Sequence, residues 1–274
     1  MTDLSFRDLY TALRKLGLDR KRPVIAHASL SAFGRVTGGA VTVVGALISI
    51  SDNLIMPAFT YKTMVIPEVG PLGNAIDYGS GMYTNRMAQF FHPDMPVDRL
   101  IGSIPEALRC YPNAGRSSHP ILSFTGLNAR RFLEAQTMTE PLAPIRRLHE
   151  EGGWVLLLGT GYTVNTSLHY AERLAGRKQF LRWALTPLGA VACPGYPGCS
   201  DGFNELEPDL ASITRRVQIG NALVQAVSLA DLVQAACARI ADDPYALLCA
   251  RSDCERCNAV RAEAGKTDRN LVKR

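Results

Sequence analysis

The chain has 274 residues, enough for one large hydrophobic core or two small domains, and its 47% hydrophobic and 20% charged residues are typical of a soluble globular protein. No apolar run approaches the roughly 20 residues of a membrane helix, and the N-terminus lacks the apolar core of a signal peptide, so we expect a cytoplasmic protein without a membrane partner. Part of the net charge of +5 lies in the tail Lys266–Arg274, which indicates a solvated end and not an arm for nucleic acid.

The first sixty residues alternate between helical and extended patterns. Ser5 is a candidate cap for the first helix, whose apolar residues recur at helical spacing. Such alternation favours an α/β domain. The expected elements are helices over 5–16 and 40–50 and strands over 23–31 and 53–60.

Residues 61–98 are rich in glycine, proline and tyrosine, with weak periodicity. A loop this long inside a compact domain is usually functional, so we expect a lid or a substrate rim. Ser103 and Glu106 have the spacing of a capping box, which predicts a helix from there towards Cys110. The elements expected next are a strand over 121–124 and helices over 128–136 and 144–151.

The pattern changes after Gly176. One or two strands are expected over 182–193 and a loop over 194–204, whereas 214–226 fits a strand, a helix or a mixture. Ser228 and Asp231 are expected to cap an amphipathic helix over 228–241. Without repeats or an obvious linker, the chain is interpreted as a single domain over 1–274, with a long loop insertion at about 61–98 and a cysteine-rich segment at about 245–260.

A short apolar run from Trp154 to Gly159 is typical of a buried strand followed by a tight turn. The residues that could cap the following helix are Asn165, Thr166 and Ser167. His169 then falls in or near the first turn, with Glu172 on the same face. Because the positive end of the helix dipole disfavours an imidazolium, this histidine is suited to general-base chemistry. A capping or core histidine is the alternative.

Two other polar segments follow predicted strands. They are His27–Ser31 and Arg116–His119. In open α/β sheets ligands bind beyond the carboxyl ends of the strands, and hydroxyl groups, backbone N–H groups and an arginine suit a phosphate. Taken alone, His27 also fits a buried histidine, and Arg116 a surface charge.

The seven cysteines do not indicate disulfides, because the chain has no secretory signal. They are interpreted as free thiols or metal ligands. The spacing Cys254-x2-Cys257 presents two thiolates in the geometry that tetrahedral zinc favours. The four candidate ligands of a structural zinc are Cys199, Cys249, Cys254 and Cys257. Cys193 could replace one of them, and Cys237 fits a core position.

Taken together, several motifs resemble those of the aminoglycoside 3-N-acetyltransferases. They occur in the family's order between about residues 22 and 258. The matching segments are His27-Ala-Ser-Leu30, Gly38-Gly39, Leu54-Ile-Met-Pro-x-Phe-Thr60, Ile104-Pro-Glu-Ala-Leu-Arg109, Arg116-Ser-x-His-Pro120, Gly159-x-Gly161 and Asn165-Thr-Ser-Leu-His169-x-Ala-Glu172. The segments Gly198-Cys-Ser-x-Gly-Phe203 and Leu206-Glu-Pro208, with the late cysteines, resemble a cysteine-bearing branch of this family.

The resemblance implies a three-layer α/β/α fold with a central mixed sheet. It also implies an enzyme that uses acetyl-CoA as co-substrate to acetylate the 3-amino group of 2-deoxystreptamine antibiotics, by direct transfer and without a covalent enzyme intermediate. By the same resemblance His169 deprotonates the amine, either Glu172 or Glu207 orients it, and His27 lies near the thioester. The implied CoA-binding residues are His27, Ser29, Leu30, Ser31, Arg116, Ser117 and His119. The expected substrate contacts are Asp77, Glu207 and Asn165.

Two alternatives remain open. Residues 61–80 hold only two carboxylates, those of Glu68 and Asp77, which is few for a polycationic drug. The second interpretation is therefore an acyltransferase of the same fold that acts on a non-antibiotic amine. The third is a zinc-stabilised binding protein without catalysis, with its basic tail as the contact surface. The sequence leaves the oligomeric state open, a homodimer being one option.

Overall fold

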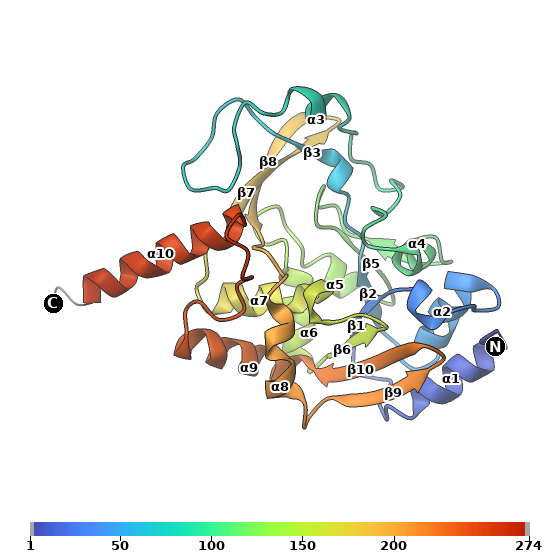
Figure 1. Ribbon diagram of the computed structural model, residues 1–274. Coiled ribbons are helices and arrows are strands. Elements are labelled where there is room, and N and C mark those ends of the chain that lie inside the picture. The colour runs from blue at the N-terminus through green and yellow to red at the C-terminus, as the bar shows by residue number, and fades with distance from the viewer. Residues whose placement is uncertain (1–2, 272–274) are drawn as a thin grey trace.

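Two sheets of different size organise the chain in this computed structural model, which describes residues 3–271 (Figure 1). β1 pairs in parallel with β2 on one side and with β6 on the other, and the remaining pairs of the larger sheet are antiparallel. The larger sheet is therefore mixed, as the resemblance implies. Its seven strands are, in spatial order, β4 (Gly115–Arg116), β5 (Phe124–Leu127), β2 (Leu54–Pro57), β1 (Val24–Ala28), β6 (Trp154–Leu158), β10 (Ala222–Ser228) and β9 (Arg215–Ile219).

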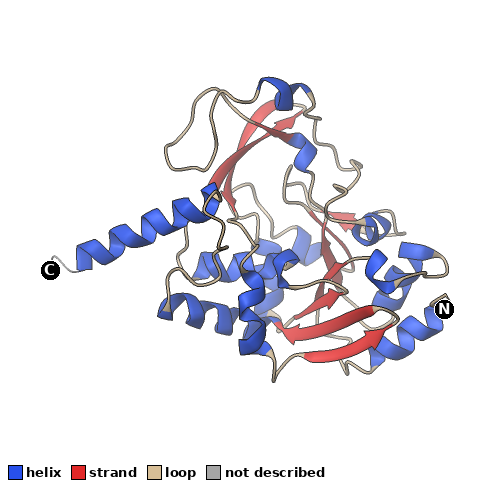
Figure 2. Ribbon diagram, viewed as in Figure 1, coloured by secondary structure: helices blue, strands red, loops and turns tan. Residues whose placement is uncertain are grey.

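Helices cover both faces of this sheet (Figure 2). Side chains alternate along β1 and β6, so that Ile25 and Leu157 enter one hydrophobic cluster while Ala26 and Leu156 enter the other. One face is covered by α1 (Phe6–Arg14), α2 (Gly39–Ile48) and α4 (Ser103–Arg109), and the other by α5 (Arg130–Leu133), α6 (Ala143–Glu150), α7 (Thr166–Leu174) and α9 (Leu229–Asp242). The three-layer α/β/α fold is confirmed.

The segment 61–98, expected to be a long loop, contains short elements and adds a strand to a second sheet. Two asparagines fix its course. Asn85 bonds the backbone N–H and carbonyl of Ile66, both at 2.8 Å, and Asn74 accepts from the N–H of Leu181 at 2.8 Å. The elements are η2 (Tyr61–Thr63), β3 (Met64–Val65) and α3 (Met82–Arg86), with β3 pairing with β7 (Phe180–Thr186) and β7 with β8 (Gly189–Tyr196). The expected region 182–193 is thus a hairpin of two strands.

Three local expectations are corrected. Ser103 is the first residue of α4 and not its cap, because Glu106 turns away to accept from the N–H of Val97 at 2.9 Å and from Arg109. β5 begins at Phe124, three residues later than expected, because residues 121 and 122 form a turn bonded to His119. Ser228 occupies the cap position of α9 without a capping hydrogen bond from its side chain.

The remaining elements complete the C-terminal half. Residues 214–226 form the hairpin of β9 and β10. The other elements are η1 (Ser31–Phe33), η3 (Tyr162–Val164), η4 (Phe203–Leu206), α8 (Glu207–Leu210) and α10 (Glu255–Leu271), the last projecting from the body (Figure 1). The side chains of the basic tail Lys266–Arg274 lie outside the described residues. Among the described helices, none has both the length and the hydropathy that crossing a membrane requires.

Candidate active site

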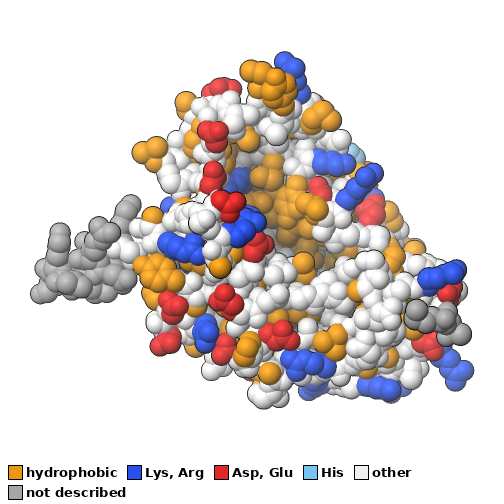
Figure 3. All heavy atoms as spheres, viewed as in Figure 1, with side chains coloured by type: hydrophobic (Ala, Val, Ile, Leu, Met, Phe, Trp, Pro, Cys, Tyr) orange, Lys and Arg blue, Asp and Glu red, His pale blue; other side chains and the backbone are white. Residues whose placement is uncertain are grey.

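A cavity of about 1060 Å³ opens at the carboxyl ends of β1 and β6. Figure 3 shows the hollow between the two sheets, with a floor that is largely hydrophobic. One wall comes from the large sheet and α7, through residues 26–31 and 160–169. The opposite wall comes from residues 59–64, 99–105 and 196–200 and from Arg256. We call this space the first cavity.

A glycine turn brings α7 to the end of β1. Gly159 has a φ of +64°, and a Cβ there would lie 2.4 Å from the Cβ of Ala32, so only glycine fits. Directly before the turn, the carbonyl of Leu158 accepts from the N–H of Ser29 at 3.0 Å. Asn165 then caps α7, its Oδ1 accepting from the N–H of Ser167 at 3.1 Å. His169 thus lies in the first turn, as the sequence predicts.

His169 is the first member of a buried chain of three charged or titratable side chains. Its Nδ1 lies 2.7 Å from Oε2 of Glu172, and Oε1 of Glu172 accepts from Arg177 at 2.9 Å. The side chains of Glu172 and Arg177 are each only 4% exposed, so their charges compensate each other away from water. No described residue hydrogen-bonds to Nε2 of His169, which leaves this atom for a ligand in the first cavity.

Three other buried polar atoms on the first cavity lack a partner among the described residues. They are His27 Nε2, Thr160 Oγ1 and Asn165 Nδ2. Burial lowers the pKa of His27 to about 3, so its imidazole is neutral at pH 7. Buried polar atoms are normally hydrogen-bonded, and here a ligand in the cavity could supply the partners.

Three of the predicted CoA contacts do not lie on the first cavity. Arg116 donates to the carbonyls of Ala58, Pro93 and Met95. Ser117 Oγ accepts from the N–H of Phe124 at 2.8 Å. His119 Nδ1 accepts from two backbone N–H groups, and burial lowers its pKa to about 4. These side chains support the fold between β4 and β5, and Arg116 does not line the cavity. Ser29, Leu30 and Ser31 do line it.

The other predicted carboxylates lie elsewhere. Glu207 is half-exposed on α8, with its carboxylate 3.9 Å from Arg216, and it does not line the first cavity. Asp77 lines a neighbouring cavity of about 710 Å³, which we call the second cavity. Asn165 lines the first cavity. Of the two proposed carboxylate partners, only Glu172 contacts His169.

The sequence interpretation missed the residues of the opposite wall. Tyr61, Met64, Arg99, Tyr196 and Arg256 all line the first cavity. Arg256 donates to the carbonyl of Gly198 at 2.7 Å, which joins the C-terminal segment to the loop after β8. Its position between Cys254 and Cys257 was the one available signal, because two residues of one buried sulfur cluster fix the course of the chain between them.

The four candidate zinc ligands come together beside this wall. The sulfur atoms of Cys199, Cys249, Cys254 and Cys257 all lie within 4.8 Å of one another, and all four residues are buried. Thiolates around zinc, with bonds of about 2.3 Å, are separated by roughly 3.8 Å, so a small contraction of the cluster would suit the ion. Cys193, the proposed substitute, belongs to a different hydrophobic cluster.

Comparison with known proteins places these features in a family. A family model described as aminoglycoside 3-N-acetyltransferase matches residues 25–241. A curated relative from Bacillus subtilis (strain 168), the SPbeta prophage-derived aminoglycoside N(3')-acetyltransferase-like protein YokD, is 31% identical over 168 residues, or 58% of this chain and 61% of the relative. The chain spans about three fifths of the length of the curated relatives it matches.

Solved structures agree over more of the chain. The apoenzyme of aminoglycoside acetyltransferase AAC(3)-IVa has a TM-score of 0.78 at 24% identity, over 96% of this chain and 98% of that one. AAC-IIIb, solved as a binary complex with CoASH, has a TM-score of 0.71 at 23% identity, over 88% and 97% of the two chains. At these identities the likeness shows the fold.

Proposed function

The chain belongs to the aminoglycoside 3-N-acetyltransferase family, and we propose that it transfers an acetyl group from acetyl-CoA to an amine with His169 as the general base. The observation that carries the proposal is the buried chain from Arg177 through Glu172 to His169, which ends on a cavity large enough for two substrates. AAC-IIIb has been solved with CoASH, and its likeness to this chain supports acetyl-CoA as the co-substrate. Such an enzyme would work in the cytoplasm, where we expect this chain.

A base is needed because an ammonium has no lone pair with which to attack a thioester, so a proton must first be removed from the nitrogen. In the proposed state Nδ1 of His169 donates its hydrogen to Glu172, which leaves Nε2 as an acceptor towards the cavity. Glu172 would also stabilise the imidazolium that forms when Nε2 takes the proton. Arg177 holds Glu172 in place, so Glu172 and Arg177 act as positioning residues.

The co-substrate supplies an acetyl thioester, whose carbon the amine attacks while CoA leaves. We place the thioester beside His27, with Ser29, Leu30 and Ser31 along the CoA chain. The unpartnered Nδ2 of Asn165 and Oγ1 of Thr160 are donors that could hold the carbonyl oxygen. Transfer is proposed to be direct, because no hydroxyl or thiol of a described residue is hydrogen-bonded to Nε2 of His169 as an activated nucleophile would be.

The family implies the 3-amino group of a 2-deoxystreptamine aminoglycoside as the acceptor. A second candidate is a non-antibiotic amine, and one observation favours it. Among the described residues that line the first cavity there is no aspartate or glutamate, whereas a polycationic drug needs carboxylates.

The test compares His169→Asn with the unchanged protein by following CoA release with a thiol reagent. We expect kcat to fall about 1000-fold, as is typical when a general base is lost, while titration calorimetry still detects CoA binding. His92→Asn is the matched control, because His92 is exposed and does not line either cavity. Equal activity of His169→Asn and the unchanged protein would refute the role of the base. A protein that binds zinc but not CoA would instead support the third interpretation, a binding protein.

We further propose that Cys199, Cys249, Cys254 and Cys257 hold one structural zinc. The support is a buried set of four sulfur ligands, the number that closes a structural site. Elemental analysis should find about one zinc per chain, which Cys257→Ser should lose together with thermal stability. Cys237→Ser, outside the cluster, should keep the metal. Metal-free protein with an unchanged melting temperature would refute the site.

A further inference from the structure

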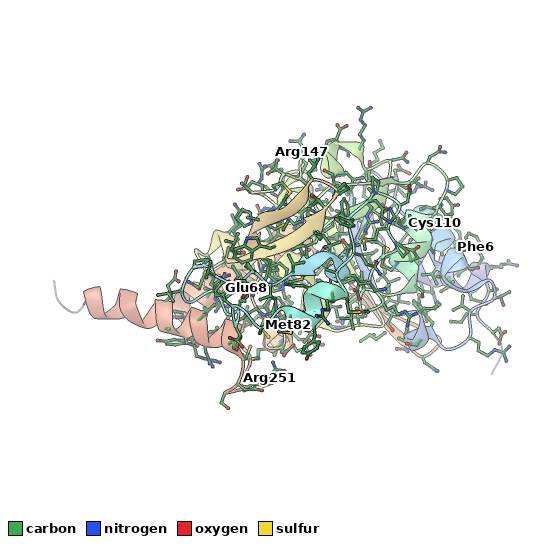
Figure 4. All side chains as sticks on the ribbon, turned by 90° about the horizontal axis from the view of Figure 1, so that it is seen from above. Phe6, Glu68, Met82, Cys110, Arg147 and Arg251 are labelled. Carbon is green, nitrogen blue, oxygen red and sulfur yellow. The ribbon has the colours of Figure 1, made fainter. Side chains whose placement is uncertain are left out.

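The second cavity opens beside the first and shares two wall residues with it. Tyr61 and Met64 line both. Its other walls come from β3, α3, the loop of residues 75–77, Arg182 on β7 and Glu255 at the start of α10. In Figure 4 the labelled Met82 marks α3, and Arg251 lies close to the start of α10. The two cavities are therefore neighbours that meet at Tyr61 and Met64, beside the insertion 61–98.

The walls of the second cavity are mainly apolar. Met64 and Val65 come from one strand, and Met87 and Ala88 follow α3. Met87 is 77% exposed, so its side chain is accessible to a ligand at this cavity. The other apolar wall residues are Ile66, Ala75 and Ile76, with the rings of Tyr61 and Tyr83. This lining is typical of a pocket for an apolar ligand.

The charges of the two cavities do not suit a polycation. The second cavity has two cationic residues, Lys62 and Arg182, and two carboxylates, Asp77 and Glu255. The first cavity adds Arg99 and Arg256 and no described carboxylate. Arg182 is fixed in place, because it donates to the carbonyls of Asn74 and Leu181 and lies over the rings of Phe180 and Tyr196. The two carboxylates are balanced by the two cations, so a polyamine meets no net negative charge in either cavity.

We infer that the acceptor is a primary amine with a single cationic group on an aryl or alkyl body, and that this body lies in the second cavity. The inference rests on the proposed acetyl transfer at His169 and specifies its substrate. The amine nitrogen bonds to the acetyl carbon and the carbon–sulfur bond of acetyl-CoA breaks. The ammonium loses two protons on its way to the amide: one is released to solvent, and the other passes through His169 to the departing CoA thiolate. Asp77 and Glu255 attract the single ammonium as it enters.

The test measures kcat/KM for phenethylamine and octylamine against neomycin and gentamicin, by CoA release with saturating acetyl-CoA. We expect the two mono-amines to exceed both aminoglycosides at least tenfold. If an aminoglycoside is the better substrate, the inference is overturned while the acetyl transfer stands. If CoA binds but none of the four amines is acetylated, both the inference and the proposed function fail.

Matched variants test whether the aryl or alkyl part of the substrate binds in the second cavity. Met64→Glu and Met87→Glu put a carboxylate on the second cavity, and each should raise KM for phenethylamine at least fivefold with kcat little changed, and lower KM for neomycin. Met82→Glu makes the same change on the exposed face of α3, outside the cavity, and should leave both values unchanged. Two cavity positions are used so that a folding defect in one does not decide the result, and calorimetric CoA binding checks each fold. Equal effects of Met82→Glu and Met87→Glu would overturn the assignment.

Discussion

The two walls of the first cavity differ in how they are built. The first wall, which carries His27, Asn165 and His169, consists of strand ends and one helix start packed on the two main hydrophobic clusters. The second wall lies opposite it in the same cavity and carries Tyr61 and Arg256. It is assembled from an insertion, a hairpin and a C-terminal segment beside the cysteine cluster. The first wall holds the buried histidines His27 and His169, and the second holds apolar groups and cations.

This difference assigns chemistry to one wall and substrate choice to the other. A base must keep its geometry to within a fraction of an ångström, which a helix anchored on the sheet provides. Substrate choice can change when a few side chains of an insertion change, and the sheet is unaffected. Substitutions on the first wall should therefore act on kcat, and those on the second wall on KM.

Among the variants that test this difference between the two walls, Glu172→Gln is expected to have the largest effect on kcat. The amide can donate to Nδ1 of His169, which would place the ring hydrogen on Nε2 and remove the acceptor from the cavity. We expect kcat to fall on the order of 100-fold with KM for acetyl-CoA unchanged. Steady-state kinetics of CoA release measures both values.

Glu140→Gln provides the control for Glu172→Gln. Glu140 pairs with Arg173 on the outer side of the same helix, so its variant also removes an ion pair from α7 but leaves His169 untouched. Its kcat should stay within about twofold, because exposed ion pairs contribute little to stability. A similar loss in both variants would mean that Glu172 acts through the stability of α7 and not through His169.

The sequence was sufficient for the first wall because its determinants are local. The strand at Trp154, the glycine turn and the cap Asn165 lie within a dozen residues, and helical spacing alone brings Glu172 to His169. Glu207 has no such relation to His169 in the chain, and it lies on another helix beside Arg216. The pattern of alternating elements predicted an α/β domain for the same reason, whereas the three layers were implied by the family resemblance.

The second wall was not predictable in this way, because long-range pairing creates it. β3 has two residues and becomes a strand only by pairing with β7, and Arg256 reaches the cavity only through the loop at Gly198. The place of Arg116 could not be predicted from the sequence either. An arginine after a strand looks the same in sequence whether it binds a phosphate or, as here, the carbonyls of Ala58 and Met95.

The smallest effect is expected at His119, whose Nδ1 accepts from the N–H of Leu122, a residue that lines the first cavity. Burial lowers the pKa of His119 from 6.5 to about 4. The unfolded chain therefore binds more protons than the folded one between these values, and stability falls as the pH drops from 7 to 5. One such group contributes about 2 kcal/mol to this fall in the free energy of unfolding.

The variant His119→Asn keeps an acceptor for the same N–H groups but does not titrate. Urea unfolding at pH 7 and pH 5 measures how far the free energy of unfolding falls between these two values. In the variant this fall should be smaller than in the unchanged protein by about 2 kcal/mol. His27, whose pKa is also lowered, contributes equally in both proteins and cancels. CoA binding should stay within about twofold, because His119 does not line the cavity. A tenfold loss of CoA affinity would instead support the CoA contact that the family resemblance implies for His119.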